Sequence, residues 1–441
     1  MKKIIVVVAG IIILAVIGTP FFNGLIMERV IRQAFGDINR MHAETGSDVS
    51  IEIQKYDRGF SRSQIEWKIS TGPLKALYGV EDIIFVDRAE HGFSGIVSTT
   101  SLEKNKWYTE FVNEKLNGKT PLEIKTQYML SGDIKSTLTL AAFSFIEGRD
   151  VIEIQPGTLS VFLDKGLKNN TSEMTWAGCS IPGKFKMDSF SLQSKIKKIS
   201  PVIWEGTVSF FVNHIMADNK KNQFDLSKLK GEYTLDYSQE EQVVSIGMGY
   251  GLDTLKSGEN EIKNAGIRIG INHIDARGYE DFVKMYSQIM SNALREISAS
   301  QQSRDTMKKA AEKQMTQMGI QLLGAYEKLL KKGLEIKLSD LRAQLPHGNI
   351  NGDVALSLKK DMTMAQFLPI MMQPSAALDI FYLKSEITLP YQLMEGNPDL
   401  MSRLFPGMQT GLFLKVGNNL VHKAETRDGK LFLNEKEVFL N

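Results

Sequence analysis

Cysteine is almost missing from this chain. Among the 441 residues there is one, Cys179. No disulfide can form within a single chain, but a chain of this length can bury a large core in two or three domains without one. Cys179 stands between Trp176 and Ser180, and no histidine is nearby in the sequence. We interpret it as a structural thiol, because free cysteine usually behaves as a small buried hydrophobe.

An excess of charge of one sign is also missing. The chain has 53 lysine and arginine residues against 51 aspartate and glutamate residues, a net charge of +2. A nucleic-acid-binding domain needs clustered lysine and arginine on a strongly basic surface. The composition therefore predicts no nucleic-acid partner.

Signatures of catalysis and of cofactor binding are missing as well. None of the six histidines pairs with another histidine or cysteine at the spacing of a zinc site. No serine-nucleophile or phosphate-loop motif occurs. The glycines at 247, 249 and 251 do not make a dinucleotide motif. That motif has its third glycine three residues after the second, and the residue three positions after Gly249 is Leu252. We expect no cofactor and no metal, and we interpret these glycines as thinning one strand face so that a helix packs closely.

One long hydrophobic run is present near the start. Lys2 and Lys3 precede an uncharged stretch from Ile4 to Phe22, close to the ~20 apolar residues that a transmembrane helix needs. The lysines predict a cytoplasmic start with the rest of the chain outside. An Ala-x-Ala cleavage pattern is missing, which favours a retained anchor over a cleaved signal peptide. Residues 1–22 are thus predicted to anchor the chain in a bacterial inner membrane, single-pass, with its bulk in the periplasm.

Residues 23–44 continue the run with a helical period. Apolar residues at 25, 26, 30, 31, 35 and 38 share one side of a 3.6-residue repeat. This pattern predicts an amphipathic stalk helix that joins the anchor to the globular body.

Residues 45–275 switch to a period of two, which is typical of strands. Alternating runs at 49–53 and 65–69 flank a turn and predict a hairpin. Similar runs recur up to residue 271 with short turns between them, whereas helical patterns occur only at 73–78 and 106–117. We predict a β-rich N-terminal domain built as an antiparallel meander.

Residues 276–441 combine a helical pair with a C-terminal α+β region. The pair covers about 277–332, and a terminal hairpin turns at Asp428 and Gly429. The second helix carries a short heptad seam, which indicates either a dimerising coiled coil or a helix lying on its own sheet. The candidate residues for an apolar groove or dimer seam are Met315, Met318, Leu322 and Leu329.

Several short motifs occur in a recognisable order. Glu28 and Asn39 lie in the stalk, and the segments 56–63, 90–93, 272–275 and 421–434 follow. Together they resemble the YdgA-like family of uncharacterised bacterial envelope proteins. The resemblance implies an inner-membrane-attached periplasmic protein, with a homodimer as one expected state, and it brings no catalytic residues.

The predicted fold class is therefore α+β, with extended antiparallel sheets packed by long helices and one N-terminal transmembrane helix. The 20 methionines favour adaptable apolar surfaces. We expect a non-enzymatic binding or scaffold protein of the cell envelope, with a lipid or another envelope protein as partner. The alternative is an envelope hydrolase that uses dispersed residues such as Asp57, His91 or Asp275.

Overall fold

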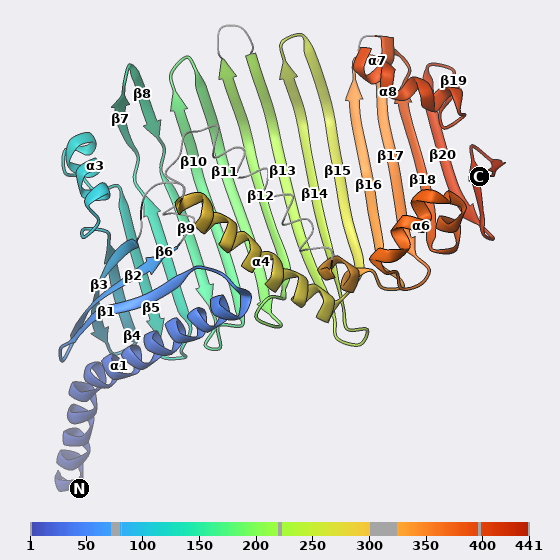
Figure 1. Ribbon diagram of the computed structural model, residues 1–441. Coiled ribbons are helices and arrows are strands. Elements are labelled where there is room, and N and C mark those ends of the chain that lie inside the picture. Colours follow the sequence, from blue (N-terminus) through green and yellow to red (C-terminus); the bar gives the residue numbers. More distant parts are fainter. Residues whose placement is uncertain are drawn as a thin grey trace. The chain divides into compact units, whose positions relative to one another are not determined.

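The structure is a computed structural model of the whole chain (Figure 1). It describes the backbone of residues 2–71, 80, 82–218, 223–299, 324–395 and 398–439. It describes their side chains too, except at 2–22, 293–299, 367–368, 371, 374, 395 and 398–400. The chain forms two compact units. The first comprises Met1–Ile181, Gln193–Trp204 and Val283–Met318, and the second comprises Pro182–Leu192, Glu205–Phe282 and Gly319–Asn441.

The first unit is built on antiparallel strands. They are β1 (Ser50–Arg58), β2 (Arg62–Ser70), β3 (Asp82–Gly92), β4 (Gly95–Ser101), β5 (Leu122–Met129), β6 (Ile134–Leu140), β7 (Phe143–Glu147), β8 (Asp150–Ile154), β9 (Gly157–Leu163) and β10 (Asn169–Ile181). From β1 to β6 each strand pairs with the next. Strands β6–β7 and β8–β9 then form one bent hairpin, which β10 extends. Pro156 lies at the bend, where a residue without an N–H costs no ladder hydrogen bond.

Helices of the first unit are α1 (Lys2–Thr45), α3 (Lys106–Leu116) and the part of α4 (Ala276–Ala299) from Val283 onward. Helix α3 matches the helix predicted at 106–117, and it ends at Asn117 in the left-handed conformation with φ 52°. Its buried residues Tyr108, Val112 and Leu116 pack against the aromatic side chains of β7. The predicted helix at 73–78 lies outside the described residues.

The second unit contains part of β11 (Phe185–Lys198) and the strands that follow it in the chain. They are β12 (Trp204–Asp218), β13 (Gln223–Ser238), β14 (Val243–Ser257), β15 (Asn260–Asp275), β16 (Glu335–Leu345), β17 (Gly348–Leu358), β18 (Phe381–Pro390), β19 (Leu414–Val416), β20 (Asn419–Arg427), β21 (Lys430–Leu433) and β22 (Lys436–Val438). Each strand from β12 to β18 pairs antiparallel with the next. Strand β20 pairs with β18, β19 and β21. The predicted terminal hairpin corresponds to β20 and β21.

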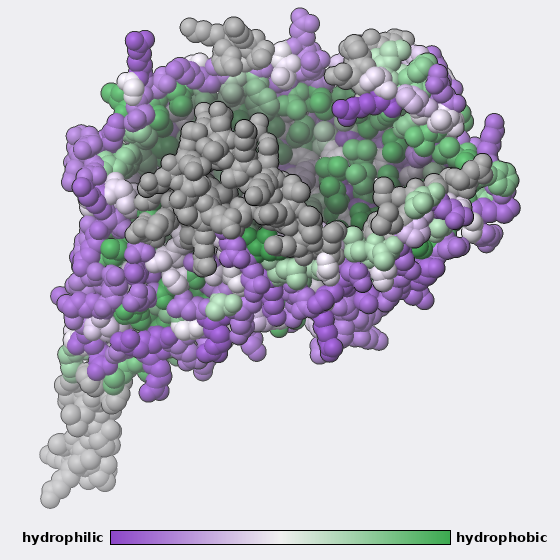
Figure 2. Space-filling view, in the orientation of Figure 1, coloured by the Kyte–Doolittle hydropathy of each residue, from purple (hydrophilic) through white to green (hydrophobic). Residues whose placement is uncertain are grey.

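Strand register gives the second unit one apolar sheet face. Directly opposed residues point to the same side of a sheet. One such row runs Tyr233, Met248, Ile269, Leu338, and the adjacent row runs Glu232, Gly249, Arg268, Ser339. Figure 2 shows hydrophobic residues gathered over strands β16–β18 of this unit.

The alternate glycines of β14 lie on the polar face. A methyl group built on Gly247 would meet Thr234 at 2.6 Å, and one on Gly251 would meet Lys230 at 2.9 Å. Side chains from the neighbouring strand therefore fill the space above these glycines. The interpretation that a helix packs there is corrected.

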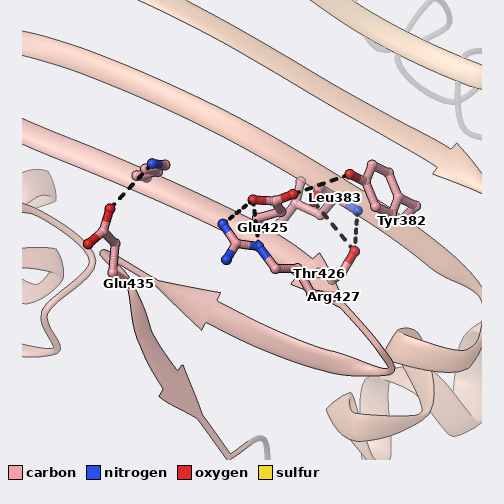
Figure 3. A network of polar contacts seen from close by, with 7 residues as sticks. Tyr382, Leu383, Glu425, Thr426, Arg427 and Glu435 are labelled. Atoms are coloured by element: carbon pink, nitrogen blue, oxygen red, sulfur yellow. Dashed lines mark hydrogen bonds and ion pairs between the residues drawn. The ribbon is translucent and has the colours of Figure 1, made fainter.

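Short helices and a polar network complete the second unit. The helices are η1 (Met364–Gln366), α6 (Phe367–Met372), η2 (Pro374–Asp379), α7 (Gln392–Glu395) and α8 (Pro398–Gln409). Helix α8 ends at Gln409, five residues before β19 begins at Leu414. In the network of Figure 3, Thr426 Oγ1 accepts the N–H of Leu383 at 2.9 Å, while Glu425 accepts hydrogen bonds from Arg427. The contact between Thr426 and Leu383 holds β18 against β20 beyond their last ladder pair.

The predicted fold class is wrong in its balance of elements. Among the residues with described side chains, strands make up 57% and helices 22%, so this part of the protein is mostly antiparallel sheet rather than a helix-packed α+β fold. The strands are longer than their apolar alternation suggests. In β13 the apolar alternation of Phe224 and Leu226 changes phase near Lys228, which adopts φ 52°. The register of β13 with β12 is the same on both sides of Lys228, so no residue is inserted there.

The predicted transmembrane anchor is also corrected. Among the residues with described side chains, which begin at Asn23, no helix combines the length and the apolar character that crossing a bilayer requires. This finding contradicts the single-pass inner-membrane location and the periplasmic placement that followed from it. The sequence argument relied on the run from Ile4 to Phe22 alone. That run is part of α1, but its side chains lie outside the described residues.

Candidate ligand-binding cavity

Helix α1 is fastened to the first hairpin by polar side chains. Asn39 donates to the carbonyl of Ile51 at 2.7 Å and accepts the Ile51 N–H at 2.8 Å. Glu28 pairs with Arg58 at 2.8 Å and with Arg32 at 3.0 Å. The side chain of Asn39 thus satisfies both backbone groups of Ile51 in β1, as a neighbouring strand would. These two hydrogen bonds fix the position of α1 on β1. Two residues noted in the sequence motifs, Glu28 and Asn39, thus position this helix.

A close contact with β3 positions α1 at Asn23 and Gly24. Asn23 Nδ2 donates to the carbonyl of Gly92 at 2.7 Å. One residue on, a methyl group built on Gly24 would lie 2.4 Å from His91 Cε1. Only glycine lets the helix backbone approach the imidazole this closely. The ring is itself held by Ser63, whose Oγ lies 2.9 Å from His91 Nε2.

Apolar packing seals the same side of α1. Met27 and Ile31 are buried to 1% and 4% exposure against Ile65. Phe35 meets the Trp67 ring at 5.3 Å between centroids, in a tilted arrangement that aromatic pairs favour. This side of α1 therefore forms part of the core of the first unit.

The adjacent side of α1 borders a cavity of about 580 Å³ against the sheet. The lining residues are Val30, Ile31, Ala34, Phe35, Asp37, Ile38, Arg40, Met41 and Glu44 from α1, with Tyr128, Ile134, Leu163, Gly166, Leu167, Asn170, Lys198 and Trp204 from the strands and turns. The volume lies within the range of small-molecule sites, roughly 300–1,000 Å³. Val30 and Glu44 are separated by four helical turns, ~21 Å along the axis, so the cavity is elongated.

Charged side chains of the lining stand mainly at its rim. Arg40 and Asp37 pair at 3.6 Å with side chains 71% and 42% exposed, a geometry that contributes little to stability. Glu44 is exposed, and the Lys198 ammonium lies 5.7 Å from the centre of the Trp204 ring. The remaining lining is almost entirely apolar, as expected of a site that excludes water from its ligand.

A second, smaller cavity of about 70 Å³ adjoins the first. It is lined by Asn23, Ile26, Met27, Val30, Gly95, Ile96, Tyr128, Met129, Leu130, Gly132, Asp133 and Ile134. Val30, Tyr128 and Ile134 line both cavities, so they stand between them. At the far side, Ile26 and Leu130 are 58% and 65% exposed.

The wall behind Tyr128 contains a buried carboxyl group. Asp87 accepts a hydrogen bond from Trp67 Nε1 at 2.7 Å and another from Thr100. Burial raises the pKa of Asp87, and these hydrogen bonds oppose the rise. Burial also raises the pKa of Tyr128, and the charge of Asp87 adds to this effect. Tyr128 therefore presents an uncharged surface to the cavity.

Asp57 and His91, the residues of the first unit considered for a hydrolase, differ in their access to solvent. Asp57 is exposed and pairs with Lys55 at 2.6 Å, whereas His91 is 5% exposed beneath α1. Asp275, in the second unit, accepts the N–H of Gly278 at 2.7 Å. Asp87 and His91 are four residues apart on β3, ~13 Å along an extended strand. The Ser63–His91 pair is therefore out of reach of the nearest buried carboxylate and of solvent.

The predicted groove or dimer seam is only partly described. Met315, Met318 and Leu322 lie outside the described residues. Leu329 is half-buried in a helical stretch at 324–329. The seam and a homodimer through it therefore stay predictions. In the described part of the chain, no cluster of three or more His, Cys, Asp or Glu residues is placed to hold a metal ion.

The cavity itself was missed by the sequence argument, although a signal existed. Helix α1 carries two adjacent apolar stripes. Met27, Ile31 and Phe35 form the one that packs on the core, and Val30, Ala34 and Ile38 form the one that faces the cavity. A helix apolar over so wide an arc must bury two faces.

These features define a class: a sheet-rich protein of antiparallel meanders with an apolar cavity beneath its first helix. The chain belongs to a family described as bacterial proteins of unknown function (DUF945), whose model matches residues 1–441. No curated protein and no solved structure matches it. The narrower YdgA-like resemblance stays a prediction.

Proposed function

We propose that this protein is a non-catalytic binding protein whose ligand is an acyl-chain amphiphile held between α1 and the sheet of the first unit. The observation that carries the proposal is the elongated cavity of about 580 Å³ with an apolar floor and charges at its rim. An acyl chain is elongated and apolar, and its polar head group suits a rim that stays in contact with water.

Binding is favoured over catalysis by what lies inside the cavity. Its deep surface is formed by Ile31, Phe35 and Tyr128, which offer no nucleophile and no general base at neutral pH. An active site needs polar groups that converge on a reacting atom. The buried histidine of this unit, His91, does not line the cavity.

Calorimetric titration with saturated carboxylates from octanoate to hexadecanoate tests the proposal. Each methylene buried contributes ~0.8 kcal/mol, so affinity should rise about fourfold per added methylene until the cavity is filled. The heat-capacity change on binding should be negative. Failure of every member of the series to bind would overturn the proposal.

A blocking variant locates the site. Ala34 lines the cavity and Gln33, beside it on α1, is exposed. Ala34→Phe should fill the space of two or more methylenes and weaken binding about tenfold or more. Gln33→Phe adds the same ring on the solvent side and should leave affinity unchanged. Equal effects of the two substitutions would place the ligand elsewhere.

A further inference from the structure

The two cavities beneath α1 share a short wall. Val30 projects from α1, while Tyr128 is the last but one residue of β5 and pairs across the ladder with Ile134, the first residue of β6. Tyr128 and Ile134 are held by the sheet, so the wall is rigid on that side. Val30 is the only contribution from the helix to the surface common to both cavities.

We infer that Val30, Tyr128 and Ile134 form a partition that sets the longest acyl chain the protein accepts. This inference rests on the proposed function and names the chain-length class of its ligand. A chain in the larger cavity meets the partition with its methyl end. Beyond it lie Met27, Ile96 and Met129, an apolar space that can take further methylenes once the wall is opened.

The size of the smaller cavity limits how many further methylenes of the acyl chain can be accepted. Its volume of about 70 Å³ exceeds the roughly 10–15 Å³ that one water-sized group needs, so it holds several such groups. Its far side reaches Ile26 and Leu130, both exposed, where a longer chain would emerge into solvent. An opened partition should therefore extend the accepted chain by a few methylenes and no more.

Val30→Ala is the variant that opens the partition. Val30 is half-buried, and alanine is the better helix former, so the change does not oppose folding of α1. Ile38→Val is the control, because Ile38 lines the larger cavity but not the smaller one. This substitution removes one carbon from the lining of the larger cavity. Both variants are to be compared with the unchanged chain in the same calorimetric series, continued to octadecanoate and eicosanoate.

The expected result is a break in the chain-length dependence. In the unchanged protein the gain of about fourfold per methylene should stop at a certain length. Val30→Ala should move that break to longer chains, and Ile38→Val should leave it in place. A break that Val30→Ala does not move overturns the partition while the proposed function stands. Absence of binding by any chain overturns both.

Discussion

The close approach of α1 to His91 can be tested with two matched substitutions. Gly24 and Gly36 both lie inside α1. A methyl group on Gly24 would meet His91 Cε1 at 2.4 Å and Nδ1 at 2.7 Å, whereas one on Gly36 would meet nothing within 4 Å. Replacing glycine by alanine inside a helix gains ~1 kcal/mol of helix propensity. That gain is common to both positions and cancels when the two variants are compared.

The difference between the variants is therefore the cost of overpacking. Forcing a methyl group into a filled site costs about 1–3 kcal/mol. His91 cannot move aside freely, because it is 5% exposed and bonded to Ser63. Gly36→Ala should stabilise α1, and Gly24→Ala should be the less stable of the two by this amount.

Hydrogen exchange followed by mass spectrometry reads the local stability of α1. The stated difference corresponds to about 5- to 150-fold faster exchange of the amides after residue 24 in Gly24→Ala than in Gly36→Ala. Ordinary chemical denaturation of both variants serves as a control for global unfolding. Equal protection of α1 in the two variants would refute the contact with His91 as the determinant of helix position.

Two further predictions concern the same unit. Because burial raises the pKa of Asp87 above its unfolded value of 3.8, its favourable contribution is complete below that value and is lost as pH rises through the folded pKa. Asp87→Asn should therefore gain stability relative to the unchanged chain from acid to neutral pH in urea titrations; a difference independent of pH would contradict this. Asn39→Ala removes both hydrogen bonds to Ile51 and should cost about 1–3 kcal/mol of unfolding free energy. An equal loss in Gln33→Ala, which changes an exposed side chain, would show that the bonds are not responsible.

Much of the strand order could be predicted from the sequence. Period-two alternation and short turns indicate an antiparallel meander, and the pairs from β12 to β18 follow it. Strand lengths could not be read in the same way, because a change of phase such as the one near Lys228 interrupts the apolar alternation that marks a strand. Strand β10 could not be delimited from the sequence, because its residues, such as Thr171 and Glu173, alternate without a clear apolar face.

The two apolar stripes of α1 indicate a second buried face, but the place of the cavity could not be predicted, because it depends on where α1 lies on the sheet. That position is set by single contacts of Asn23, Gly24 and Asn39. These three residues do not form a repeating pattern in the sequence. Hydrophobic periodicity detects repeated burial, not a single hydrogen bond or a missing side chain. The hydrophobic run before Asn23 favoured a membrane anchor, whereas α1 from Asn23 onward packs on the sheet of the first unit.

The meander of the second unit has a consequence for how such chains change over time. From β12 to β17 every strand pairs with the strand that follows it in the chain. Insertion or deletion of two adjacent strands would keep the alternating direction of the remaining strands. No pairing between strands far apart in the sequence would have to change. Members of this family should therefore differ in length by whole hairpins in this region, with the rows of apolar residues continuing unbroken across the junction.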